Sequence, residues 1–123
     1  MNNILRRAMK KIIKYEEERP WGSFVRFTLN EKSSVKIITL KPKQKTSLQF
    51  HKKRQEFWKV LDNPIRVTVG KRTWIAKPGE EIQVKKKELH RLEGISKAAR
   101  VLEISQGEFD EKDIVRVEDI YGR

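Results

Sequence analysis

Two histidines and a glutamate are the residues of this chain whose types and spacing could support chemistry at a metal ion. His51 and Glu56 lie five residues apart, and His90 is the only other histidine. Two imidazoles and one carboxylate are the minimum ligand set for a divalent metal with open coordination positions, as used for Zn, Mn or non-haem Fe. The spacing leaves three roles open for Glu56: a metal ligand, a general base or a salt-bridge partner of Arg54.

The segment that contains His51 has the alternation of a β-strand, in which successive side chains point to opposite faces. One face carries the polar residues Ser47, Gln49, His51 and Lys53. The other face carries Leu48 and Phe50. Two interpretations stay open: the polar row lines a pocket, or Leu48 and Phe50 fill the core and His51 faces solvent.

The elements that must position these residues are short β-type runs, separated by turn residues at intervals of roughly ten residues. We expect strands over residues 23–29, 35–40, 46–50, 56–61, 65–69, 72–76, 81–84, 89–92 and 99–104. Pro42, Gly70 and Pro78-Gly79 mark turns between them. This spacing predicts an all-β sandwich or barrel, and the lack of a crossover helix disfavours a βαβ fold. Residues 110–119 are expected to form a turn followed by a short strand or helix.

The beginning of the chain differs from the rest. Apolar pairs recur every four residues at Ile4/Leu5, Ala8/Met9 and Ile12/Ile13, which predicts an amphipathic helix over residues 3–15. We therefore divide the chain into a basic helical extension, residues 1–18, and a β domain, residues 19–123. The apolar face of the helix is expected to pack on its own domain or on a partner subunit, because most helical stability comes from tertiary packing. The alternative is a helix that lies on an anionic membrane or on a nucleic acid.

Composition excludes several classes of protein. The chain has no cysteine, which excludes disulfides, thiolate metal sites and cysteine nucleophiles. It has no apolar run of about 18 residues and no secretory signal, so we expect no membrane span and a cytoplasmic location. The formal net charge of +12 suits a phosphorylated small molecule, a nucleic acid or an anionic lipid surface, and equally the surface of a protein from a thermophile.

Aromatic and basic residues are interleaved at Phe57-Trp58-Lys59 and at Arg72-Thr73-Trp74. Such a pattern is consistent with base stacking in a nucleic-acid interface. Buried barrel aromatics explain it more simply, so nucleic-acid binding is a secondary interpretation.

Several collinear motifs resemble one family: Arg19-Pro20-Trp21-Gly22-Ser23-Phe24, Ser47-Leu48-Gln49-Phe50-His51, Pro78-Gly79-Glu80, His90-Arg91-Leu92-Glu93, Asp113-Ile114-Val115-Arg116 and Tyr121-Gly122-Arg123. With them, residues 19–123 resemble the cupin domain of type II mannose-6-phosphate isomerases, which in many members follows a mannose-1-phosphate guanylyltransferase domain. The resemblance implies a double-stranded β-helix, or jelly roll, a metal-supported conversion of mannose 6-phosphate to fructose 6-phosphate, and a homodimer. The chain is too short for the transferase domain, so we expect any guanylyltransferase to be a separate partner.

Two positions depart from the family's pattern. Lys53 stands where the family has its second ligand histidine. Lys85-Lys86-Lys87 replace the turn that the family has before its ligand histidine, here His90. The lysine run is either a substrate clamp or an exposed loop. A protonated lysine has no lone pair for a metal. Either His51, Glu56 and His90 hold Zn or Mn with Lys53 turned aside, or the Lys53 ammonium pairs with Glu56 in a metal-free site. We expect the second arrangement, because the ammonium already neutralises the carboxylate.

An isomerase of this family needs a base, an electrophile and a phosphate anchor. The resemblance assigns the base to Glu56 or His90 and the electrophile to Lys53 or a metal. The residues expected to bind substrate are Gln49, Arg54, Arg91 and Arg116, since guanidinium groups match phosphate oxygens in pairs. The expected ligand is a phosphorylated hexose or a nucleotide sugar. The alternative is a catalytically inactive cupin that binds sugar phosphate, nucleic acid or a protein partner.

Overall fold

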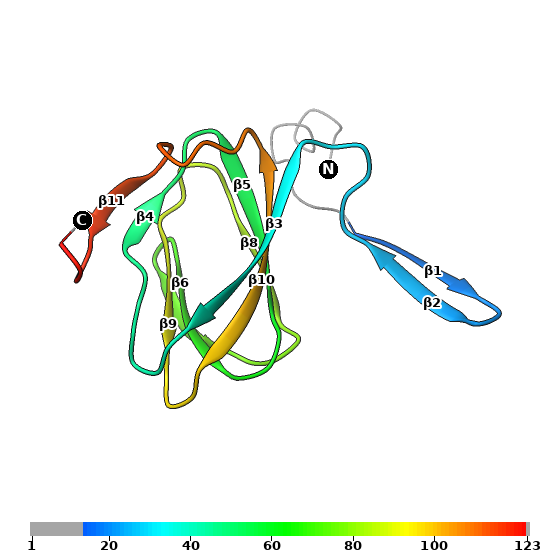
Figure 1. The fold of residues 1–123 in the computed structure, drawn as a ribbon, viewed down its shortest axis with the longest axis horizontal. Helices are drawn as coiled ribbons and strands as arrows, with labels where there is room; N and C mark the ends of the chain where they lie inside the picture. Colours follow the sequence, from blue (N-terminus) through cyan, green and yellow to red (C-terminus); the bar gives the residue numbers. More distant parts are fainter. Residues whose placement is uncertain (1–13, 123) are drawn as a thin grey trace.

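The computed structural model describes residues 14–122, which form strands and turns without a helix. Figure 1 shows two sheets packed face to face, with a hairpin that extends away from them. One sheet has four strands in the order β3 (Ser33–Leu40), β10 (Ala99–Gly107), β5 (Arg54–Val60) and β8 (Glu81–Val84). The other has five, in the order β11 (Val115–Glu118), β4 (Leu48–Phe50), β9 (His90–Gly94), β6 (Ile65–Val69) and β7 (Arg72–Ala76). All neighbouring strands are antiparallel, and the prediction of an all-β cupin jelly roll is confirmed.

The core lies between the two sheets and follows from the alternation of the strands. β6 shows this most clearly, because Ile65, Val67 and Val69 are buried while Arg66 is exposed and Thr68 is half-buried. β5 is buried on both faces: Trp58 and Val60 point into the main core, and Phe57 packs with Ile104 in a second cluster. β5 therefore lies at the centre of the molecule, and any polar side chain on its inner face is enclosed.

The predicted strands correspond to β2 through β10, with ends that differ by a few residues. The expected run over 23–29 is shorter, since β2 covers Gly22–Arg26, and the tail of the chain forms strand β11 rather than a helix. Lys87 and the rest of the lysine run form an exposed turn between β8 and β9.

The predicted N-terminal helix over residues 3–15 falls almost entirely outside the described residues. Its last residue, Tyr15, opens strand β1 (Tyr15–Arg19), so residues 15–18 of the predicted helical extension form a strand. β1 pairs with β2 (Gly22–Arg26) in the projecting hairpin of Figure 1, and Trp21 at its turn is 74% exposed. Among residues 14–122 no helix is long and apolar enough to cross a membrane.

Candidate metal centre

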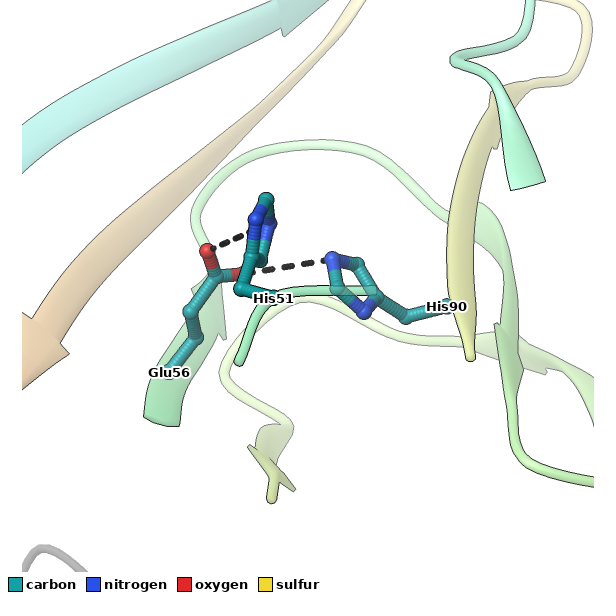
Figure 2. A group of neighbouring side chains, drawn as sticks. All are labelled: His51, Glu56 and His90. Atoms are coloured by element: carbon teal, nitrogen blue, oxygen red, sulfur yellow. Dashed lines mark ion pairs between the residues drawn. The ribbon is translucent and has the colours of Figure 1, made fainter. Parts of the chain in front are cut away.

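His51, Glu56 and His90 converge inside the barrel and form what we call the His-Glu-His cluster (Figure 2). His51 follows β4, Glu56 lies on the inner face of β5, and His90 opens β9. One ligand atom from each residue lies within 4.8 Å of the others, and the three residues are only 4%, 2% and 3% exposed. The prediction that these groups meet is confirmed, and His51 faces the interior rather than solvent.

The two imidazoles present bare nitrogens to the carboxylate. His51 Nδ1 lies 2.6 Å from the carbonyl oxygen of Asp113, and His90 Nδ1 lies 2.9 Å from that of Glu88. A carbonyl only accepts, so both Nδ1 atoms carry hydrogen, and each Nε2 carries a lone pair and no hydrogen when the ring is neutral. Burial lowers the pKa of both histidines, which favours this neutral form.

The geometry of the His-Glu-His cluster fits a divalent metal. His51 Nε2 lies 3.4 Å from one oxygen of Glu56, and His90 Nε2 lies 3.6 Å from the other. Ligands held at about 2.1 Å from a metal in tetrahedral geometry are about 3.4 Å apart. His90 Nε2 is buried and has no hydrogen-bond partner, which is costly unless a cation or donor reaches it.

Trp58 completes the surroundings of the carboxylate. Its Nε1 donates to Glu56 Oε1 at 3.1 Å, and its ring packs edge-on against His90 with centroids 5.5 Å apart. Trp58 is two residues beyond Glu56 on the same strand, so both side chains share the inner face. Trp58 is thus a buried support of the site, while Phe57 packs in the second cluster on the opposite face of β5. The two residues are 1% and 5% exposed and present no face for base stacking.

The cation beside Glu56 is Arg54, not Lys53. Arg54 Nε donates to Glu56 Oε2 at 3.2 Å, and Arg54 Nη2 lies 3.2 Å from His51 Nε2. The expected pairing of Lys53 with Glu56 is wrong: Lys53 Nζ lies 3.7 Å from Asp110, and its side chain is 53% exposed. Strand alternation explains the exchange, because Arg54 is two residues from Glu56 and shares its face, whereas Lys53 does not.

The other predicted substrate-binding residues lie on two different faces of the five-stranded sheet. Arg116, Gln49 and His90 are directly opposite one another across β11, β4 and β9, so their side chains share the inner face. Arg91 follows His90 and points outward, where it donates to the carbonyl oxygen of Thr46 at 2.9 Å and to Glu118 at 3.0 Å. The register therefore places Gln49 and Arg116 on the same face as His90, whereas the hydrogen bonds of Arg91 attach β11 to the sheet.

Asp113 positions the segment between His51 and β5, a role that the sequence did not suggest. Its carboxylate accepts from the backbone N–H groups of Lys52 and Lys53, both at 2.9 Å, and its carbonyl orients His51. The backbone N–H of Lys87 donates to the carbonyl oxygen of His51 at 2.7 Å. The segment that carries the first ligand is thus held from two distant parts of the chain.

Glu103 is a second buried carboxyl group that the sequence analysis missed. It lies on β10, 5% exposed, opposite Trp58 in the sheet register. Ser105 Oγ donates to it at 3.3 Å and Lys36 Nζ lies 3.7 Å away. Burial, with the nearby charge of Glu56, raises the pKa of Glu103. The sequence did contain a signal for this. Val101 and Glu103 are spaced two residues apart in a predicted strand, so Glu103 shares the inward face of Val101.

Comparison with known proteins adds a family to this geometry. The chain matches the family described as mannose-6-phosphate isomerase C-terminal over residues 7–119. It is 34% identical over 110 residues to the alginate biosynthesis protein AlgA of Pseudomonas aeruginosa, and 36% identical over 110 residues to the mannose-1-phosphate guanylyltransferase ManC of Salmonella typhimurium. Each match covers 88% of this chain and 23% of the relative, so the chain spans about a quarter of the length of these curated relatives.

Solved structures support the fold. A putative sugar phosphate isomerase from Acidithiobacillus ferrooxidans superposes with a TM-score of 0.56 at 18% identity, covering 62% of this chain and 51% of that one. KdgF from Halomonas sp. superposes with a TM-score of 0.62 at 9% identity, covering 70% and 80%. At these identities the similarity concerns the double-stranded β-helix architecture alone.

Proposed function

Because the chain belongs to the mannose-6-phosphate isomerase C-terminal family, we propose that it binds a phosphorylated hexose beside the His-Glu-His cluster and interconverts mannose 6-phosphate and fructose 6-phosphate. The observation that carries the proposal is the convergence of His51, Glu56 and His90 in a chain of this family. The names of two relatives, an alginate biosynthesis protein and a mannose-1-phosphate guanylyltransferase, are consistent with a sugar phosphate as ligand.

In this proposal His51, Glu56 and His90 hold a divalent ion such as Zn or Mn. When bound, such an ion polarises a sugar oxygen and stabilises the negative charge that develops when a proton leaves the neighbouring carbon. Trp58 holds one oxygen of Glu56, and the carbonyl groups of Asp113 and Glu88 keep each Nε2 aimed inward. Lys53 has no part in the reaction, since its ammonium points to Asp110.

We assign the proton transfer to Glu103, because Glu56 and His90, the bases expected from the sequence, serve as ligands. Glu103 removes the proton from C2 of the open-chain aldose and returns it to C1, while the hydroxyl proton on O2 passes to O1. The atoms balance without an oxidant or a reductant. The raised pKa of Glu103 and its contact with the Lys36 ammonium suit a group that must both take and give a proton.

The phosphate group is proposed to bind at the inner face of the sheet edge. Arg116 is exposed there, beside Gln49 in the register with His90. A guanidinium can give two parallel hydrogen bonds to a phosphate. A nucleotide sugar would place its diphosphate on the same groups.

A direct assay tests the proposal. Protein stripped with a chelator is supplied separately with Zn, Mn or Co, and fructose 6-phosphate formation from mannose 6-phosphate is followed with a coupled dehydrogenase. We expect turnover that needs the metal and is lost in His51→Ala and His90→Ala, while Arg66→Gln, a surface change on β6, retains it. Absence of turnover with every metal would reject the isomerase assignment.

The second candidate is an inactive cupin that binds sugar phosphate without converting it. One observation favours it: Arg54 already neutralises Glu56 without a metal. Calorimetry would then record mannose 6-phosphate binding by metal-free protein, with no product in the assay.

We further propose a homodimer. The outer face of the edge strand β3 exposes Val35 and Ile37, 61% and 53%, and a second copy would cover this apolar area. Light scattering at micromolar concentration tests the dimer, and a monomer at that concentration would exclude it.

The cytoplasmic location and the thermophilic origin stay predictions.

A further inference from the structure

The Arg54 guanidinium occupies space that a metal at the His-Glu-His cluster would need. Its Nε and Nη2 each lie 3.2 Å from a ligand atom, Glu56 Oε2 and His51 Nε2. Arg54 is only 6% exposed, so water screens its charge poorly. A divalent ion bonded to the same two atoms would face the guanidinium at close range, and the two cations would repel each other.

We propose that Arg54 is a built-in competitor of the metal, and that metal binding releases its guanidinium to bind the anionic group of a substrate. In the metal-free protein the planar guanidinium holds His51 and Glu56 in the arrangement that the ion later uses. This inference rests on the proposed function for the metal site and for the anionic character of the substrate.

The surroundings of Arg54 provide a place for the released group. The guanidinium carbon lies 4.5 Å from the centroid of the Phe109 ring, which is 39% exposed, and Lys36 Nζ lies 5.8 Å from the same ring. The guanidinium thus lies between the buried ligands and a partly exposed aromatic ring. The guanidinium and the Lys36 ammonium thus both lie beside the same ring, and two cations beside a partly exposed ring favour an anion.

Two linked equilibria follow. An anion that binds the released guanidinium favours the metal-bound state, and by reciprocity the metal raises the affinity for the anion. Removal of the Arg54 charge abolishes the competition and this coupling together. A merely structural arginine would produce neither effect.

The experiment is a Co²⁺ titration of the full chain, read by calorimetry and by the absorption of the bound ion, with and without sodium sulfate as the anion probe. We compare the wild-type chain with Arg54→Gln and with Arg66→Gln, whose side chain is 45% exposed and pairs with Glu93 on the surface. Arg54→Gln is expected to bind Co²⁺ roughly tenfold or more tightly than wild type, a change of the size seen when groups around metal ligands are altered. Sulfate should tighten Co²⁺ binding by the wild-type chain and by Arg66→Gln, but not by Arg54→Gln.

A measurement on the wild-type chain removes the dependence on a folded variant. The Nε–H of Arg54 donates to Glu56 inside the protein, so its nitrogen-15 NMR signal is expected to be protected from exchange with water in the metal-free protein. It should lose that protection when the site is saturated with diamagnetic Zn²⁺, used here in place of Co²⁺. A signal that keeps its protection with Zn²⁺ bound would overturn the inference.

The remaining outcomes separate the inference from the proposed function. Equal or weaker Co²⁺ binding by Arg54→Gln overturns the competition and leaves the metal site standing. Absence of a sulfate effect on the wild-type chain overturns the release toward an anion. Absence of Co²⁺ binding by the wild-type chain and by Arg54→Gln rejects the proposed metal site, and with it the inference.

Discussion

Acidification should destabilise the metal-free protein, because two neutral histidines are enclosed in it. Burial lowers the pKa of His90 and of His51 from the ordinary value of 6.5. The unfolded chain therefore binds more protons than the folded chain as the pH falls below 6.5, and the stability that the neutral rings contribute above that value is lost. An imidazole that stays uncharged in the fold costs up to about 1.4 kcal/mol at about one pH unit below its unfolded pKa. The two rings together cost up to about 2.8 kcal/mol at about pH 5.5.

Urea unfolding followed by tryptophan fluorescence measures this loss, with a chelator present throughout. For a slope of about 2 kcal/mol per molar urea, a loss of about 1.4 kcal/mol moves the midpoint by about 0.7 M. His90→Gln is the matched comparison, because glutamine does not titrate. Between about pH 7.5 and about pH 5.5 the urea midpoint of this variant should fall less than that of the wild-type chain, by a difference of up to about 0.7 M. Glu103, whose pKa is raised, acts in the opposite direction, but it is present in both proteins and cancels. Equal midpoint shifts in the two proteins would refute the reasoning, since they would mean that His90 is protonated in the fold.

Three further changes test other parts of the structure. Glu103→Gln should lower kcat for isomerisation by roughly a hundredfold or more and leave Co²⁺ affinity unchanged, and a comparable loss of Co²⁺ affinity would show that Glu103 supports the metal instead. Lys53→Gln should change the free energy of unfolding by no more than about 0.5 kcal/mol and leave Co²⁺ binding intact, because its side chain is largely exposed; a large effect on Co²⁺ binding would place Lys53 in the site after all. Gly94→Ala should cost about 3 kcal/mol in thermal unfolding, since the new Cβ would lie 2.2 Å from the carbonyl oxygen of Lys41, and an unchanged melting temperature would show that the backbone yields there.

The strands around the core could be predicted from the sequence because alternation and turn residues are local signals. β6 is the clearest case, where buried Ile65, Val67 and Val69 alternate with Arg66 and Thr68. β1 could not be found in this way, because the segment Tyr15–Arg19 consists mainly of charged residues and pairs outside the barrel. Its strand character comes from its partner β2, not from burial of an apolar face.

The candidate site could be predicted in its composition but not in its electrostatics. His51, Glu56 and His90 were found from residue type and family motif, and they do converge. The choice of cation was wrong, although the alternation that puts Arg54 on the face of Glu56 was already present in the sequence. The role of Asp113 could not be predicted, because its contacts with His51 and with Lys52 span about half of the chain and arise only in the folded state.

The contact of His51 Nδ1 with the carbonyl of Asp113 also determines when the His-Glu-His cluster can form during synthesis of the chain. On the ribosome both histidines and the glutamate are synthesised well before residue 113. A nascent chain that has not yet reached residue 113 therefore holds all three side chains of the His-Glu-His cluster, yet the imidazole of His51 has no carbonyl to set its tautomer and its orientation. The cluster therefore reaches its finished geometry only after residue 113 has been synthesised and has folded onto the segment that follows β4.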